Sequence, residues 1–291
     1  MAVDEVGDAV TSGARSAGRT AFVLGGGGLL GASQVGMLRA LDKRGIRPDL
    51  IVGTSVGAMN GAFFAGAPGE SAVAELARLW SDLDRAGVFA DSPIRQVARV
   101  AKHRTHLHSP EPLRRVLTAA LRGRFEDLAI PFSCVAANIE YARPTWFDSG
   151  PLVDAVMASC AVPGLLPPAR IGGQHYFDGG LVASIPLGRA VRAGAREIYV
   201  LQVGRAERSL SAPRWPWEVG VIAFEIARRA HFTEQMDNLP DDVQVHLLPS
   251  GPIDTPLVSW RYRRTTDVAD RMELAYAACE QYLDGVEAAA R

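Results

Sequence analysis

The segment Leu50-Ile51-Val52-Gly53-Thr54-Ser55-Val56-Gly57 decides how this chain is expected to fold. Residues 50–52 form a short apolar run typical of a buried strand, and residues 56–65 are rich in small side chains that suit a packed helix. The Gly-x-Ser-x-Gly pentapeptide lies between them. Its two glycines, Gly53 and Gly57, allow the sharp turn that exposes a serine at the end of a sheet. The pattern predicts a strand, turn and helix that present Ser55.

The residues before this segment repeat the alternation of strand and helix. Residues 20–24 form another apolar run that stops at four consecutive glycines, and residues 32–44 place apolar side chains at helical spacing before a glycine stop. A strand, a helix and a second strand in this order make a βαβ unit. We therefore expect an α/β protein whose mostly parallel sheet is covered by helices.

Periodicity predicts the remaining elements in the same way. The expected helices cover residues 71–83, 93–104, 109–121, 216–236 and 267–289, and the expected strands cover 132–137, 198–203 and 243–248. Residues 1–19 read as a flexible tail, and no repeat or linker interrupts the rest of the chain. The sequence thus predicts a single domain over residues 20–291.

Composition and charge narrow the class of protein. Hydrophobic residues make up 48% of the 291 residues, and the net charge is -1, which argues against a dedicated nucleic-acid partner. The chain has three cysteines, Cys134, Cys160 and Cys279. Their odd number argues against a disulfide framework, and their spacing does not fit a zinc site. Both observations favour a cytoplasmic protein. The first twenty residues lack the features of a signal peptide, and the uncharged stretches contain too many glycines and prolines for a membrane span.

Nucleophilic chemistry at Ser55 would need a base and donors for an oxyanion, because a serine hydroxyl is a weak nucleophile. The run Gly25, Gly26, Gly27 and Gly28 leaves several main-chain N–H groups unobstructed before a predicted helix, and these are the candidate oxyanion-hole donors. The pattern Gly26-x-Gly28-x-x-Gly31 also fits a dinucleotide-binding loop. That alternative expects an acidic residue at the end of the second strand, whereas Asp49 stands at its beginning.

Two candidates for the base remain open from the residues alone. Among the six histidines, only His246 follows an acidic residue at a late position beside a predicted strand, which would fit a Ser-His-Asp esterase. Asp178 is followed by Gly179 and Gly180, which leave its carboxylate unshielded and its backbone free to turn tightly. A plain Asp-Gly turn explains the same three residues equally well.

Taken together, the motifs resemble the patatin-like phospholipase family. The matches are the glycine loop at 25–31, the pentapeptide at 53–57, the Asp-Gly-Gly at 178–180 and the stretch 158–168 ahead of it, and the similarity spans residues 21–203. The resemblance implies a three-layer α/β/α sandwich and a serine acyl hydrolase of lipid or related esters. It also implies a dyad of Ser55 and Asp178 that needs no catalytic histidine, metal or cofactor.

Two positions depart from the family pattern. Leu30 stands where the glycine loop usually carries arginine or lysine, and Ser184 stands where an asparagine often follows Asp-Gly-Gly. These departures keep a second hypothesis open, in which the chain is a catalytically weak regulatory or binding protein with the same fold.

Basic and aromatic clusters suggest peripheral contact with the inner face of a membrane. Residues 95–104 hold four basic side chains, Arg114 and Arg115 follow, and tryptophans occur at positions 215, 217 and 260. Such residues suit anionic headgroups and the interface depth of a bilayer, although a solvated basic face is the alternative. The irregular region 84–110 is the expected position of any mobile cover.

Overall fold

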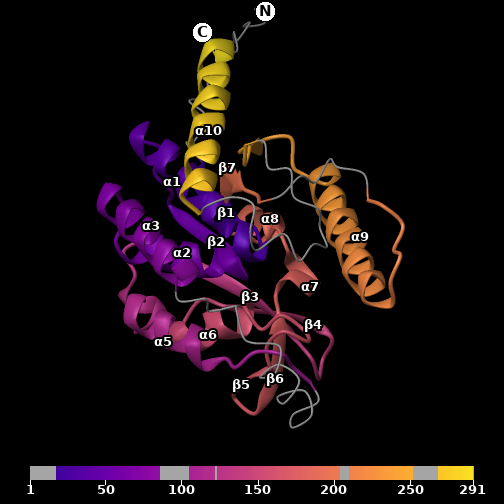
Figure 1. The fold of residues 1–291 in the computed structure, drawn as a ribbon. Coiled ribbons are helices and arrows are strands. Elements are labelled where there is room, and N and C mark those ends of the chain that lie inside the picture. The colour runs from indigo at the N-terminus through magenta and orange to yellow at the C-terminus, as the bar shows by residue number, and fades with distance from the viewer. Residues whose placement is uncertain (1–17, 86–104, 122, 204–209, 252–267, 291) are drawn as a thin grey trace, which may run out of the picture.

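A computed structural model describes residues 18–85, 105–121, 123–203, 210–251 and 268–290 (Figure 1). Residues 1–17 of the tail predicted over 1–19 lie outside the described residues, and Arg19 is the first residue of β1. The basic helix predicted over 93–104 also lies outside the described residues, as do Trp260 and its neighbours. Expectations for these segments therefore stay predictions.

An eight-stranded sheet forms the centre of the fold, in the order β5-β6-β3-β2-β1-β7-β8, with β4 paired to β3 outside this path. The pairs β1–β2, β1–β7, β2–β3 and β7–β8 are parallel, whereas β4, β5 and β6 join by antiparallel pairing. The strands are β1 (Arg19–Leu24), β2 (Leu50–Thr54), β3 (Phe132–Asn138), β4 (Arg143–Phe147), β5 (Ala169–Ile171), β6 (Gln174–Asp178), β7 (Ala195–Leu201) and β8 (Gln244–Leu247).

Helices connect most of these strands. They are α1 (Ala32–Lys43), α2 (Val56–Gly66), α3 (Glu70–Arg85), α5 (Glu111–Ala120), α6 (Leu152–Ser159), α7 (Gly180–Ala183), α8 (Leu187–Arg192), α9 (Pro216–Asp237) and α10 (Val268–Ala290), with 3-10 turns η1 (Gly28–Gly31) and η2 (Phe125–Asp127). Each predicted element that falls on described residues is present, displaced by at most three residues at an end. The antiparallel strands β4 to β6 and the short helices α6 to α8 were not predicted.

The alternation of side chains along β1 explains the three layers. Phe22 and Leu24 point into a core shared with α1, α2, α3 and α10, whereas Ala21 and Val23 point into a second core. That second core also contains residues of α8 and α9. Figure 1 shows the two helical layers on opposite sides of the sheet. Because successive strand residues face opposite sides, one apolar run of four residues supplies both cores.

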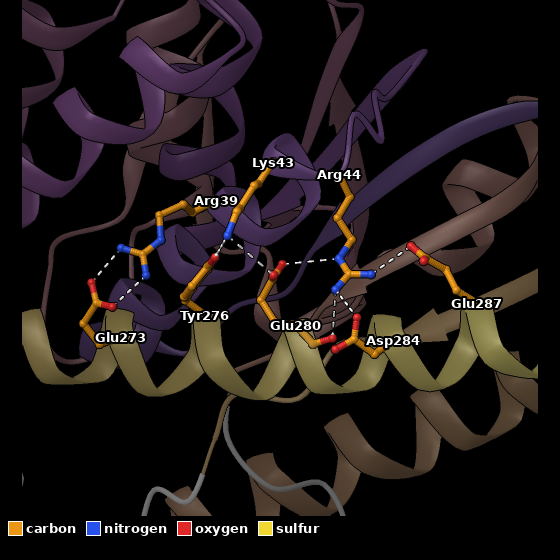
Figure 2. Close-up of polar contacts among 8 residues, drawn as sticks. All are labelled: Arg39, Lys43, Arg44, Glu273, Tyr276, Glu280, Asp284 and Glu287. Carbon is orange, nitrogen blue, oxygen red and sulfur yellow. Dashed lines mark hydrogen bonds and ion pairs between the residues drawn. The ribbon is translucent and has the colours of Figure 1, made fainter.

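Helix α10 is fixed against α1 by a row of polar contacts (Figure 2). Three basic side chains at the C-terminal end of α1 face four carboxylates and a tyrosine of α10. The cations are Arg39, Lys43 and Arg44, and the partners are Glu273, Tyr276, Glu280, Asp284 and Glu287. Exposed ion pairs contribute little stability singly, but a row of them favours one register of the two helices. The last helix is thereby tied to the first βαβ unit.

Candidate active site

Ser55 lies directly after β2, at the point where the chain turns into α2. Its backbone angles are φ 55° and ψ −124°, a conformation with positive φ that a residue with a side chain rarely adopts. Gly57 makes the turn possible, since a Cβ atom there would lie 2.2 Å from the carbonyl oxygen of Leu24. The predicted strand, turn and helix are therefore present, with Ser55 at the turn.

Asp178 lies at the end of β6 and meets Ser55 across the sheet. The Ser55 Oγ atom donates a hydrogen bond of 2.6 Å to Oδ2 of Asp178, and the Gly180 amide donates one of 2.7 Å to Oδ1. Both side chains are buried. Burial raises the pKa of Asp178 to about 6, against the opposing effect of the hydrogen bonds from Ser55 and Gly180.

A short chain of hydrogen bonds from the end of α6 holds the two residues in place. The Ser55 amide donates to Oγ of Ser159, and the Gly179 amide donates to the Ser159 carbonyl oxygen. The Asp178 amide donates to the carbonyl of Ala161. Ser159, which is fully buried, therefore contacts Ser55 through its hydroxyl group and Gly179, the residue after Asp178, through its carbonyl group. The sequence patterns assigned it no role, although it lies within the stretch 158–168 that carried the resemblance.

The glycine loop passes beside the serine, but only part of it is free to donate. A Cβ atom on Gly26 would lie 3.4 Å from the Cβ atom of Ser55. The amides of Gly25 and Gly26 already donate to the carbonyls of Leu201 and Ser184, so they cannot serve as the expected oxyanion donors. Within the described residues, the amides of Gly27 and Gly28 have no acceptor. These two are the available donors.

The side chains of Gln34, Asn60 and Trp80 form a buried hydrogen-bond network that holds the glycine loop. Nε2 of Gln34 donates to the carbonyls of Gly25 and Leu201, and Oε1 of Gln34 accepts from Nδ2 of Asn60. Nδ2 of Asn60 also donates to the carbonyl of Gly31, while its Oδ1 accepts from the indole of Trp80. Both ends of the loop are thus tied to α1 and α2. The sequence patterns missed this network, although an asparagine among the small apolar residues of α2 was a usable signal.

The two departures from the family pattern act here through main-chain atoms. The Leu30 amide donates to the carbonyl of Gly27, and the Ser184 carbonyl accepts from the Gly26 amide. The Ser184 hydroxyl oxygen lies 3.7 Å from the position that a Cβ atom of Gly26 would take. Since any residue supplies the same main-chain groups, the loop keeps its conformation without the usual side chains.

His246 lies on β8, away from Ser55. Strands β1 and β7 separate β8 from β2, which corresponds to about 14 Å at the usual strand spacing. The His246 ring stacks on Tyr199 and lies near Tyr282 and Glu197. Burial lowers its pKa and so favours the neutral imidazole, against the opposing effect of Glu197. The arrangement therefore gives no support to the Ser-His-Asp alternative.

Cys134, Cys160 and Cys279 are buried free thiols whose pKa values are raised by burial, as expected for core residues. Among the described residues, no cluster of histidine, cysteine and acidic side chains could hold a metal ion. None of the helices described has the length and apolar character needed to cross a bilayer.

The Gly26-x-Gly28-x-x-Gly31 loop also runs beside Ser55, which fits a hydrolase better than the dinucleotide alternative. At the end of β2, where a ribose-binding carboxylate would stand, the chain instead has Thr54 and Ser55.

Comparison with known proteins gives relatives that match about two thirds of the chain. Lysophospholipase NTE1 of Mycosarcoma maydis is 32% identical over 191 residues, which cover 63% of this chain and 10% of that protein. Patatin-like phospholipase domain-containing protein 7 of Rattus norvegicus is 30% identical over 192 residues, covering 65% of this chain and 14% of that protein. The chain therefore matches a small part of each of these much longer relatives.

Among solved structures, VipD from Legionella pneumophila aligns with 92% of this chain and 67% of its own, at 15% identity and a TM-score of 0.46. The family model for patatin-like phospholipases matches residues 22–191, which is more than half of the chain and includes both Ser55 and Asp178. The chain therefore belongs to the patatin-like phospholipase family.

Proposed function

We propose that this chain hydrolyses carboxylic esters of lipids, of the phospholipase A or lysophospholipase type, with Ser55 as nucleophile and Asp178 as base. The observation that carries the proposal is the 2.6 Å hydrogen bond from Ser55 Oγ to Asp178 Oδ2 in a buried site. A nucleophile within hydrogen-bond reach of its base is the geometry that covalent catalysis requires. The names of the relatives support a phospholipid or lysophospholipid substrate.

In the proposed mechanism, Ser55 Oγ attacks the ester carbonyl carbon while its proton passes to Asp178 Oδ2. The carbonyl oxygen becomes an oxyanion that accepts hydrogen bonds from the Gly27 and Gly28 amides. The bond to the alcohol oxygen then breaks, and Asp178 returns the proton to the departing alcohol. A water molecule attacks the acyl-enzyme and gives one proton to Asp178. Collapse of this second intermediate releases the fatty acid and restores the serine hydroxyl.

The burial of Asp178 supports its role as the base. An ordinary aspartate, with a pKa near 3.9, accepts a proton poorly at neutral pH. Burial raises the pKa of Asp178 to about 6, so the group is mostly ionised at pH 7 and yet holds a proton more strongly. General-base assistance of this kind contributes roughly 10²–10⁴-fold to the rate.

The outer face of α9 is a candidate contact for a lipid surface. Trp215, Val219 and Ile226 are each more than half exposed, and α9 packs against α7 beside the site. A Cβ atom on Gly180 would lie 3.1 Å from the ring of Phe224. We propose that this face rests on the lipid aggregate that holds the substrate. Ile226→Asp should then weaken binding to phosphatidylglycerol vesicles without changing turnover of a short aryl ester.

The alternative of a catalytically weak binding protein has less support. Its best evidence was the identity of Leu30 and Ser184, yet both contribute main-chain groups that any residue could supply. A positive φ at Ser55 and a buried, partly desolvated Asp178 are costly features that a binding protein would have no reason to keep.

A fluorophosphonate probe tests the proposed function directly. The probe should label the wild type, and Ser55→Ala should abolish labelling. Both Ser55→Ala and Asp178→Asn should lose turnover of an aryl ester and of a lysophospholipid. Full turnover by Asp178→Asn would contradict the dyad, and a wild type that the probe does not label would favour the binding protein.

A further inference from the structure

Helix α10 brings a buried cation to the glycine loop. Arg271 is only 4% exposed, and its Nη1 atom donates a hydrogen bond of 3.2 Å to the carbonyl oxygen of Leu29. The loop from Gly25 to Gly31 contains no charged residue of its own. Arg271 also lies beyond residues 22–191, the part of the chain that the family model matches. The positive charge beside the loop therefore comes from α10.

Hydrogen bonds connect this cation to the Gly28 amide through two peptide groups. Arg271 holds the carbonyl of Leu29, and the N–H on the opposite edge of that peptide group, which belongs to Leu30, donates to the carbonyl of Gly27. In a trans peptide the C=O and N–H groups point in opposite directions. The carbonyl of Gly27 therefore fixes the direction of the Gly28 N–H, whose hydrogen has no acceptor within the described residues.

Such a chain also changes the strength of its last donor. Each hydrogen bond polarises the next peptide group in the same direction, and a charged group at the start increases the effect. The Gly28 amide thus stands at the end of a chain that begins with a cation.

The packing of α10 on α1 sets the position of Arg271. A Cβ atom on Gly36 would lie 2.0 Å from the carbonyl oxygen of Met272, so the two helices approach closely just beside Arg271. The polar contacts of Figure 2 continue along the same pair of helices and favour a single register. The close packing of α10 on α1 therefore places Arg271 beside the glycine loop.

We propose that Arg271 is a positioning residue of the oxyanion hole, acting through Leu29, Leu30 and Gly27 on the Gly28 amide. The inference rests on the proposed function, because the role is defined by the reaction at Ser55. It assigns a catalytic contribution to a helix outside the matched family region. The contribution would appear in the transition state, where the oxyanion forms, and not in substrate binding.

The test compares Arg271→Met and Arg271→Lys with Arg189→Met as a matched control. Arg189 is a partly buried arginine on α8 that hydrogen-bonds to Asp148 and lies over the ring of Trp146, neither of which belongs to the loop. Circular dichroism first establishes a temperature at which every variant is folded. The measurements are kcat and KM on a short aryl ester and the rate of labelling by a fluorophosphonate.

We expect Arg271→Met to lower kcat and the labelling rate at least tenfold, with KM changed less than twofold. Arg271→Lys should recover part of the loss, and Arg189→Met should stay within twofold of wild type. A folded Arg271→Met with wild-type kcat would overturn the inference and leave the proposed function intact. If Arg271→Met does not fold, Arg271→Gln takes its place under the same criterion. A wild type that the probe does not label would overturn both proposals.

Discussion

Ser55 Oγ and Asp178 Oδ2 lie 2.6 Å apart, although 123 residues separate them in the chain. They come from different kinds of strand, since β2 lies in the parallel part of the sheet and β6 in its antiparallel part. Strand β3 lies between them and pairs with both. The contact therefore depends on the point where the sheet changes from parallel to antiparallel pairing.

Asp178→Asn should raise the stability of the fold while it removes activity. The pKa of Asp178 is about 6 in the fold against an ordinary value of 3.8, so the folded state favours the protonated form. The protonated Asp178 carboxyl group contributes its full stability to the fold below pH 3.8, and this contribution is lost as the pH rises through 6. The cost of the buried charge is about 3 kcal/mol at pH 8. Asparagine stays neutral, so Asp178→Asn should unfold at higher urea at pH 8, with turnover lowered roughly 10²–10⁴-fold.

Urea titrations at pH 8 and pH 5 check this expectation. The difference in unfolding free energy between Asp178→Asn and wild type should shrink at the lower pH, because the wild-type carboxyl is then largely protonated. An equal difference at both pH values would contradict the assignment of the shifted pKa.

The pH dependence of turnover should report the same carboxyl group. Asp178 must be ionised to accept the serine proton, so kcat/KM should fall on the acid side with a midpoint near pH 6. An aspartate with an ordinary pKa would place that midpoint about two units lower. The measurement is the initial rate on an uncharged aryl ester between pH 4.5 and 8.5, with unfolding monitored at each pH. A rate that stays constant from pH 5 to 7 would exclude Asp178 as the titrating base.

The strained backbone at Ser55 gives a prediction that is independent of catalysis. A residue with a side chain at φ 55° and ψ −124° carries a cost of roughly 1–3 kcal/mol, which glycine does not have. Glycine normally destabilises a folded chain by about 0.5–1 kcal/mol relative to alanine. Ser55→Gly should nevertheless be more stable than Ser55→Ala by about 1 kcal/mol, as measured by urea unfolding. The reverse order would show that the turn is relaxed.

His246→Phe should separate the dyad from a histidine triad. Phenylalanine preserves the stacking on Tyr199, so probe labelling should stay within about threefold of wild type, whereas a triad would lose it. The lowered pKa of His246 means that its neutral form stabilises the fold above pH 6.5 and that this stability is lost as the pH falls through the lowered value. His246→Phe should therefore lose less stability than wild type between pH 7 and 5, which thermal unfolding measures.

The first βαβ unit could be predicted from sequence because its evidence is local. The apolar run of β1, the glycine loop and the pentapeptide follow one another within a few turns of chain, and each has a recognisable pattern. Strands β4 to β6 could not be predicted because they are short and form no apolar run. Most of their side chains are exposed in part or in full.

Local sequence patterns could not predict the residues that support the site. Ser159 acts through its contact with Ser55, and Arg271 acts through a carbonyl 242 residues away. Nothing in their own sequence neighbourhoods indicates those partners. The packing of α6 against β3 and α2 brings Ser159 to the serine, and the packing of α10 on α1 brings Arg271 to the loop.

A pair of glycine substitutions should test how closely α10 must pack for the site to work. Gly36→Ala places a methyl group 2.0 Å from the Met272 carbonyl oxygen, which can be relieved only by moving α10, so we expect a loss of about 2–3 kcal/mol in unfolding free energy. Gly285→Ala on α10 meets no atom within 4 Å and should instead add about 0.5–1 kcal/mol. Because a displaced α10 withdraws Arg271 from Leu29, folded Gly36→Ala should also label more slowly with a fluorophosphonate, and Gly285→Ala should label at the wild-type rate. Equal labelling by both variants, with Gly36→Ala destabilised, would mean that the position of α10 matters for the fold and not for the oxyanion loop.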